Sequence, residues 1–157
     1  MEIADEHGVV VMEDAAQSFG AHQNGAMAGS FGYVNCFSMN PMKVYNAFGE
    51  AGAIVTGDED LYQKLLSLRY AGTINREDCH YPSLNGRIDT IQAAMLLVNL
   101  EHLESKIARR RANAEYYSQT LGESVICPTE EDGCFNVYYT YTIICSLFSW
   151  WYDHYSI

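Results

Sequence analysis

Lys43 stands in a segment whose residue types suit covalent chemistry with a carbonyl compound. It ends the run SMNPMK at residues 38–43, and the turn FGEAG at residues 48–52 follows after a short gap. A lysine amine can form a Schiff base when its surroundings favour the neutral form and hold it within reach of one carbonyl carbon. Most lysines are exposed, so Lys43 alone would be interpreted as a surface side chain. The flanking residues and an acidic motif upstream favour the covalent role.

The upstream motif places Asp14 directly after an apolar run. Residues 8–12 read GVVVM, and Glu13, Asp14, two alanines and Gln17 follow. Strands covered on both faces in a parallel sheet are apolar without alternation, and ligands of open α/β sheets bind beyond the carboxyl ends of strands. The pattern therefore predicts a buried parallel strand with Asp14 at its functional end. The alternative is that Asp14 caps a following helix, because aspartate side chains often accept hydrogen bonds from free helix N–H groups.

The rest of the chain follows the pattern of an α/β protein. Residues 33–39 and 52–56 are typical of short strands. Asp58 and the acidic residues after it favour a helix start, leucines recur at helical spacing from Leu61 to Leu68, and Gly72 suits the stop.

A second and longer helix is predicted from Asp89 to Gly122. Asp89 and Gln92 have the spacing of a capping box, and the apolar stripe of this segment indicates packing against a core. Residues 130–133 are typical of a loop, and residues 137–144 are β-rich and predict a further strand.

Four motifs in order resemble those of the DegT/StrS-type sugar aminotransferases, which are pyridoxal-phosphate enzymes of the aspartate aminotransferase fold. They occupy residues 13–17, 37–43, 49–56 and 85–94, and the resemblance runs from Gly8 to about Leu121. It implies an α/β fold with a mixed, mostly parallel sheet and flanking helices. Residues 1–121 would belong to the large cofactor-binding domain, including its long connecting helix, and residues 122–157 would begin a small α+β domain.

The resemblance also implies roles around a bound pyridoxal phosphate. Lys43 would form the Schiff base with the cofactor and then move a proton, and Asp14 would face the pyridine nitrogen. Gln17 would lie beside the ring, and Ser38 would bind the phosphate. A fixed carboxylate is needed because the cofactor withdraws electrons well only while its ring nitrogen stays protonated. Lys43 argues against the dehydratase branch of this family, which has histidine at that position.

The implied activity is transfer of an amino group from glutamate to a nucleotide-linked keto-sugar. The implied assembly is a homodimer in which Asn85 reaches a cofactor phosphate across the interface, with Arg87 beside it. Residues 149–157 do not resemble the family, and its early phosphate-binding turn and ring-stacking aromatic residue are not found in this sequence. A non-catalytic remnant that pairs with a full-length paralogue therefore stays as the alternative.

Composition, net charge and cysteine spacing argue against several other kinds of protein. At 157 residues, 48% hydrophobic, the chain can bury one core of ordinary size, and its net charge of -11 opposes nucleic-acid binding. Arg109–Arg111 is interpreted as a solvated helix face. No basic leader or long apolar run is present, so we expect a cytoplasmic protein without a membrane segment. Five cysteines without C-x-x-C spacing favour reduced thiols over a disulfide framework or a metal site.

Overall fold

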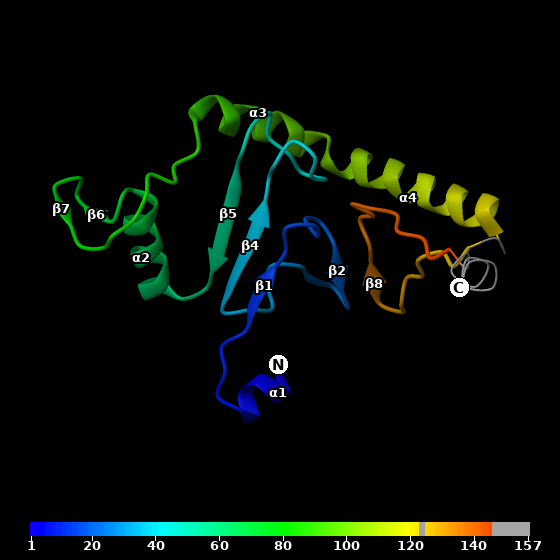
Figure 1. Cartoon of the computed structure of the whole chain (residues 1–157), viewed down its shortest axis with the longest axis horizontal. Coiled ribbons are helices and arrows are strands. Elements are labelled where there is room, and N and C mark those ends of the chain that lie inside the picture. The colour runs from blue at the N-terminus through cyan, green and yellow to red at the C-terminus, as the bar shows by residue number, and fades with distance from the viewer. Residues whose placement is uncertain (123–124, 146–157) are drawn as a thin grey trace, which may run out of the picture.

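The fold was analysed in a computed structural model, which describes residues 1–122 and 125–145. It is a mixed α/β structure, as predicted, in which a central sheet lies between two smaller ones (Figure 1). The helices are α1 (Glu2–Glu6), α2 (Glu59–Arg69), α3 (Thr90–Glu101) and α4 (Leu103–Leu121). The strands are β1 (Met12–Asp14), β2 (His22–Gln23), β3 (Ala26–Met27), β4 (Val34–Ser38), β5 (Gly52–Thr56), β6 (Thr73–Ile74), β7 (Asp78–Cys79) and β8 (Cys134–Phe135).

The central sheet has the order β1-β4-β5 and is mixed. β1 and β4 are parallel, whereas β4 and β5 are antiparallel, with Ser38 opposite Gly52. Both strands predicted from residues 33–39 and 52–56 are confirmed. Because β1 and β4 are parallel neighbours, their carboxyl ends meet at one edge of the sheet, and the chain segments that carry Asp14 and Lys43 both leave from that edge.

The apolar run before Asp14 differs from the prediction of a buried strand. The strand begins only at Met12, and Val9 and Val10 are 59% and 70% exposed. β1 has a single strand neighbour among the described residues, so the apolar run is not covered. The prediction that this strand pairs in parallel is confirmed, and the prediction that it is buried is wrong.

The start of α2 confirms the helix predicted after Asp58. The Asp58 carboxylate accepts a hydrogen bond from the Leu61 backbone N–H at 2.7 Å, which satisfies one of the free donors at the helix start. The helix ends before Gly72, whose φ of +73° is readily adopted by glycine.

The single long helix predicted from Asp89 to Gly122 is two helices. They break at His102, and each contributes to a different part of the core through Leu96 and Ile107. The predicted capping box is also wrong. Asp89 makes no side-chain cap, and the Gln92 side chain is engaged elsewhere: its Oε1 accepts hydrogen bonds from the backbone N–H groups of residues 48 and 49.

The strand predicted over residues 137–144 is replaced by irregular backbone, and within the described residues 125–145 the named strand is β8. Asn136 Oδ1 accepts a hydrogen bond from the Tyr138 N–H at 2.8 Å, and Tyr138 has a φ of +47°. This local turn stops the extended conformation, because side chains of this type compete with sheet ladders for backbone groups. Ile144 still forms an isolated bridge with Ile126.

The core consists of two clusters that meet at the loop after β4. The first contains Met39, Tyr45, Ala47 and Leu96, and the second contains Val44, Ile107 and Val137. The loop therefore packs against α3, α4 and the segment after β8 together. The proposed domain division at residue 121 stays a prediction, although Val137, at 1% exposure, lies in the second cluster.

Two further features concern the predictions of a protein without a membrane segment and with reduced cysteines. None of the described helices combines the length and apolar character that crossing a bilayer requires. The cysteines are all free thiols, and no group of three potential metal ligands occurs within residues 1–122 and 125–145.

Candidate active site

The loop after β4 holds Lys43 in a defined turn. The Lys43 N–H donates to the Asn40 carbonyl at 2.9 Å, and Asn40 Oδ1 accepts from the Met42 N–H at 3.0 Å. The next two residues, Val44 and Tyr45, are buried. Their burial fixes the backbone on one side of Lys43, so the lysine stem leaves from a rigid base.

The Lys43 amine lies against an aromatic ring. Its Nζ is 4.4 Å from the centre of the Tyr139 ring, and the lysine is half-buried. It makes no ion pair with a carboxylate within the described part of the chain. The side chain also lines a hollow of about 390 Å³, where Lys106, Arg109 and Arg110 of α4 add further positive charge. The amine is therefore not tied to an acid.

The strand register brings Asp14 and Ser38 to the same face of the sheet. Asp14 pairs with Cys36 across the parallel β1–β4 contact, and Ser38 is two residues further along β4. Side chains two apart in a strand share a face, and so do directly paired residues. Both groups keep hydrogen-bonding capacity. Asp14 Oδ1 accepts from the Ala16 N–H at 3.1 Å, and Ser38 Oγ accepts a long bond of 3.4 Å from the Asn40 N–H.

Glu13 points to the opposite face and has a structural role. Its carboxylate accepts three backbone hydrogen bonds, from Gly29 at 2.8 Å, Phe31 at 2.7 Å and Gly32 at 3.1 Å. Partial burial raises the pKa of Glu13, but these three donors outweigh it and hold the pKa below its ordinary value. Glu13 thereby closes the turn that leads into β4. The neighbouring Asp14 is turned the other way, as alternation along a strand requires.

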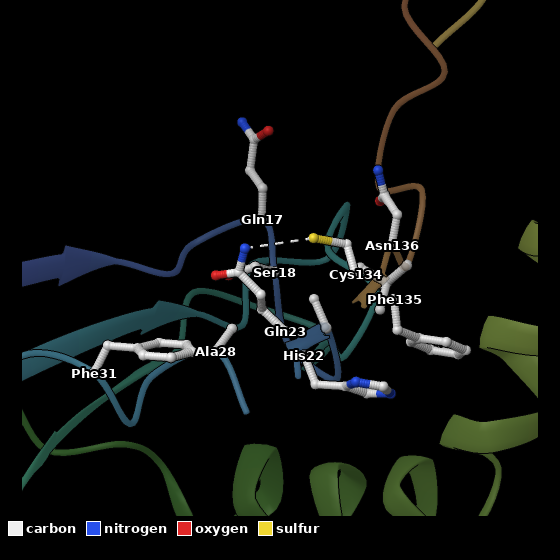
Figure 2. Close-up of a pocket in the computed structure, with 11 residues that line it drawn as sticks. Gln17, Ser18, His22, Gln23, Ala28, Phe31, Cys134, Phe135 and Asn136 are labelled. Atoms are coloured by element: carbon white, nitrogen blue, oxygen red, sulfur yellow. Dashed lines mark hydrogen bonds between the residues drawn. The ribbon is translucent and has the colours of Figure 1, made fainter. Parts of the chain in front are cut away.

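Gln17 is exposed at the rim of a hollow of about 380 Å³ between its own loop and β8. Figure 2 shows its amide directed away from the rings of His22 and Phe135, which stack 4.7 Å apart on the inner side. The His22 Nδ1 is buried without a hydrogen-bond partner among the described residues. Gln23 donates to Cys134 Sγ at 3.6 Å across the same hollow (Figure 2).

Asn85 and Arg87 lie apart from the other predicted residues. They precede α3, on the side of the molecule that carries α2 and the β6–β7 hairpin (Figure 1). Asn85 Oδ1 accepts from Arg87 Nε at 3.1 Å, and the Arg87 guanidinium lies 4.3 Å from the centre of the Tyr70 ring. Residues 81–90 are all exposed. The two side chains are thus ordered locally and face solvent.

The structure groups part of the predicted set. Asp14 and Ser38 are the last residues of β1 and β4, and Gln17 and Lys43 lie in the loops that follow these strands, whereas Asn85 and Arg87 precede α3. The loops after these two strands are joined by packing, because Phe19 contacts Phe37 with 5.1 Å between ring centres and Tyr45 with 4.5 Å. The space beyond the ends of adjacent parallel strands is where ligands of α/β proteins bind. Gln17 and Lys43 line two separate hollows of the described structure.

Comparison with known proteins decides the family. Residues 1–148 match the DegT/DnrJ/EryC1/StrS aminotransferase family. The chain belongs to this family. A pleiotropic regulatory protein of Geobacillus stearothermophilus is 39% identical to it over 145 residues, which are 90% of this chain and 39% of that relative. A dTDP-3-amino-3,4,6-trideoxy-alpha-D-glucose transaminase of Micromonospora megalomicea subsp. nigra is 36% identical over 151 residues, which are 90% of this chain and 40% of that protein.

Solved structures agree with the family assignment. The crystal structure of S. venezuelae DesV in complex with a ketimine intermediate superimposes with a TM-score of 0.88 at 34% identity, over 98% of this chain and 42% of that one. The crystal structure of an aminotransferase of the same family from Brucella abortus superimposes with a TM-score of 0.85 at 34% identity, over 90% of this chain and 38% of that one. The chain thus spans about two fifths of the length of these family members, and its fold is that of a partial sugar aminotransferase.

The residues present fit the pyridoxal phosphate that the family implies. Asp14 offers a second carboxylate oxygen, Oδ2, with no partner within the described residues, and the Ser38 hydroxyl can still donate. Lys43 supplies an amine that forms no ion pair with a carboxylate of the described residues. An amine reacts with an aldehyde, an anionic acceptor pairs with a protonated ring nitrogen, and a hydroxyl donates a hydrogen bond to a phosphate.

Three contributors to the site were not found from the sequence. Tyr139 lies against the Lys43 amine from 96 positions downstream, Gln92 fixes the turn at residues 48 and 49, and Glu13 fixes the turn before β4. Only the role of Glu13 could have been inferred from the sequence. Side chains alternate between the two faces of a strand, so Glu13 and its neighbour Asp14 must point to opposite faces. The other two depend on contacts between distant segments.

The interpretation of Arg109–Arg111 as a solvated helix face is wrong for two of these residues. Arg110 donates to the carbonyls of Tyr138 and Tyr139, at 3.3 and 3.4 Å. Arg111 forms a two-pronged ion pair with Glu130, with N–O distances of 2.6 and 3.0 Å. The Arg111 hydrogen bonds, which outweigh partial burial, hold the pKa of Glu130 below its ordinary value.

Proposed function

We propose that the chain is the central part of a pyridoxal-phosphate-dependent aminotransferase that transfers an amino group from glutamate to a nucleotide-linked keto-sugar. The observation that carries the proposal is the arrangement at one sheet edge. Asp14 and Ser38 share a face at the ends of β1 and β4, and Lys43 follows in a loop that two core clusters anchor. The family membership supports the same reaction class.

Each group has a distinct role in this proposal. When bound, pyridoxal phosphate supplies an aldehyde that reacts with amines and a ring that withdraws electrons from the substrate carbon. Asp14 holds the proton at the ring nitrogen, because its carboxylate favours the charged form of that nitrogen. Ser38 donates its hydroxyl hydrogen to the phosphate. Gln17 borders the ring and limits its tilt.

Lys43 has two roles in succession. It first anchors the cofactor through its amine, and after the substrate amine has replaced it, the free amine carries the proton from the substrate carbon as a general base. Its rigid backbone matters here, since misplacing a reacting group by about 1 Å can cost about 100-fold in rate.

Asn85 and Arg87 enter the proposal as groups that act on a second subunit. Both are exposed and too remote to join the site of their own chain as described. Positioned across a homodimer interface, Asn85 would donate its amide N–H to the partner's cofactor phosphate, and Arg87 would supply positive charge beside it.

The substrate class rests on relatives. Proteins similar to this chain are named as transaminases of dTDP-linked and UDP-linked sugars. We infer that the amino acceptor is of the same class, a keto-sugar on a nucleoside diphosphate.

The proposal is tested by the kinetics of two variants of the protein produced from its whole gene. Lys43→Ala should retain cofactor but lose transamination. Asp14→Asn should retain cofactor and lose about 100-fold or more in turnover, because preorganised charge at a reacting group is commonly worth several kcal/mol. Asp132→Asn, an exposed aspartate in the loop before β8, serves as the matched control and should leave turnover unchanged. Near-normal turnover in Asp14→Asn would remove Asp14 from the ring-nitrogen role, and retained transamination in Lys43→Ala would overturn the proposal.

A further inference from the structure

An aromatic ring lies beside the Lys43 amine. It indicates a positioning residue, which takes no part in the bond changes of the proposed reaction. The Lys43 Nζ lies 4.4 Å from the centre of the Tyr139 ring, within the range in which an ammonium is attracted to the face of an aromatic ring. Two other lysines are available for comparison. Lys64 lies 5.5 Å from the centre of the Tyr81 ring, and Lys106 donates to Asn99 Oδ1 at 2.8 Å.

The Tyr139 ring is itself held in place from several directions. Tyr139 packs against the cluster of Val44, Ile107 and Val137. The guanidinium of Arg110, on α4, donates to the Tyr139 carbonyl at 3.4 Å and to the preceding carbonyl at 3.3 Å. The ring is therefore a fixed surface, and not a side chain that moves with the lysine.

The same cluster anchors both partners of the contact. Val44 follows Lys43 directly and is 3% exposed, so the backbone that carries the amine and the ring that receives it share one apolar support. A lysine side chain has many accessible rotamers, which makes a fixed attractive surface an effective means of limiting where its amine goes.

We propose that Tyr139 is the positioning residue for Lys43: its ring face holds the amine in one place before the cofactor reacts with it. This inference rests on the proposed function, because it takes Lys43 as the reacting amine. The contact does not need the phenol hydroxyl, since attraction to the ring face is a property of the ring. Phenylalanine should therefore replace tyrosine, whereas an aliphatic residue should not.

The test measures how fast Lys43 is methylated by formaldehyde and cyanoborohydride in protein freed of cofactor with hydroxylamine. The rate at each lysine is read by peptide mass spectrometry. Tyr139→Leu should raise the Lys43 rate about threefold to tenfold, as expected for losing a contact of this kind at a half-buried site. Tyr139→Phe should leave that rate within about twofold of the parent.

Lys64, which lies on α2 and outside the hollow that Lys43 lines, reports in the same samples whether each variant is folded. Its rate should not change in any folded variant. Tyr116→Leu, the same change at an exposed tyrosine of α4, should leave all the rates unaltered. If Tyr139→Leu accelerates every lysine, it has unfolded, and the comparison is made with Tyr139→Met, which fills a similar space without a ring.

Two results would overturn the inference. One is a Lys43 rate in the ringless variant equal to that of the parent, and the other is equal acceleration in Tyr139→Phe and the ringless variant. Because no cofactor or substrate takes part, this outcome is independent of the variant kinetics that test the aminotransferase proposal.

Discussion

Adjacent acidic residues, Glu13 and Asp14, serve different purposes because they face opposite sides of one strand. Glu13 accepts three backbone hydrogen bonds and shapes the turn before β4, whereas Asp14 accepts one, from the Ala16 N–H, and is the residue proposed to face the cofactor. The sequence motif was predicted as a unit, and Asp14 received the functional role within it. In the structure, Glu13 stabilises the turn before β4, and its neighbour Asp14 points to the opposite face.

Glu13→Gln should lower the free energy of unfolding by about 1–3 kcal/mol. A glutamine amide presents an N–H₂ group to N–H donors and loses the charge that strengthens these bonds. Urea unfolding of the variant and the parent measures the difference. The control is Glu77→Gln, an exposed residue in the β6–β7 turn, which should change stability by less than about 0.5 kcal/mol. Equal stability of Glu13→Gln and the parent would contradict the structural role.

The lowered pKa of Glu13 also predicts a pH dependence. A carboxyl group whose pKa falls on folding adds stability that is present above its unfolded value, about 4.3, and is lost as the pH falls through the folded value. The parent protein should therefore lose more stability than Glu13→Gln between about pH 5 and pH 3. Unfolding curves at a series of pH values test this, and parallel pH dependences would contradict it.

At the scale of elements, Gln92 ties α3 to the turn that follows the Lys43 loop. Its Oε1 accepts hydrogen bonds from the N–H groups of Phe48 and Gly49 at 2.9 and 3.0 Å. Leucine at this position leaves both donors without a partner, which should cost about 1–3 kcal/mol of stability. Gln119→Leu on α4 is the control, because Gln119 is exposed and its side chain hydrogen-bonds, within the described residues, to Glu115 one turn away. Urea unfolding should show a loss for Gln92→Leu alone, and equal losses in both variants would contradict the account.

Local sequence signals found most of the elements, and they failed where contacts between distant segments decide. Asp58 was identified as a helix cap because the interaction lies within three residues. Gln92 was assigned to a capping box by its spacing, but its partners are 43 and 44 positions away. The strand predicted over residues 137–144 failed because of a local turn, in which Asn136 Oδ1 accepts from the Tyr138 N–H. A distant contact adds to this, because Arg110 donates to the carbonyls of Tyr138 and Tyr139.

The candidate site was predictable to a similar degree. Motif resemblance placed Asp14, Ser38 and Lys43 together, and the parallel register of β1 and β4 brings the first two to one face. Tyr139 could not be found, because nothing in its own segment indicates that it lies beside Lys43.

For the whole molecule, the amount of exposed surface has a physical consequence. The chain exposes 11748 Å², whereas a compact protein of its mass, 17.7 kDa, exposes about 8,000 Å². Large apolar side chains of α3 contribute to this surface: Ile91, Leu97 and Val98 are 64%, 66% and 55% exposed. Apolar surface of this extent favours association.

The 157-residue chain on its own should therefore self-associate and be a poor aminotransferase. Sedimentation velocity at micromolar concentration should show oligomers or aggregates. Leu97→Gln should reduce association, and Gln63→Leu, on the exposed face of α2, should not. A stable monomer that completes the glutamate half-reaction at about 10 per second, an ordinary enzyme rate, would contradict this prediction.

The identity of the reacting lysine tests the central claim most directly. The protein, produced from its whole gene, is incubated with pyridoxal phosphate and reduced with borohydride, and the labelled peptide is identified by mass spectrometry. The account predicts that the phosphopyridoxyl label is on Lys43, while Lys64 and Lys106 stay essentially unlabelled. Label concentrated on another lysine, or spread evenly over all of them, would contradict it.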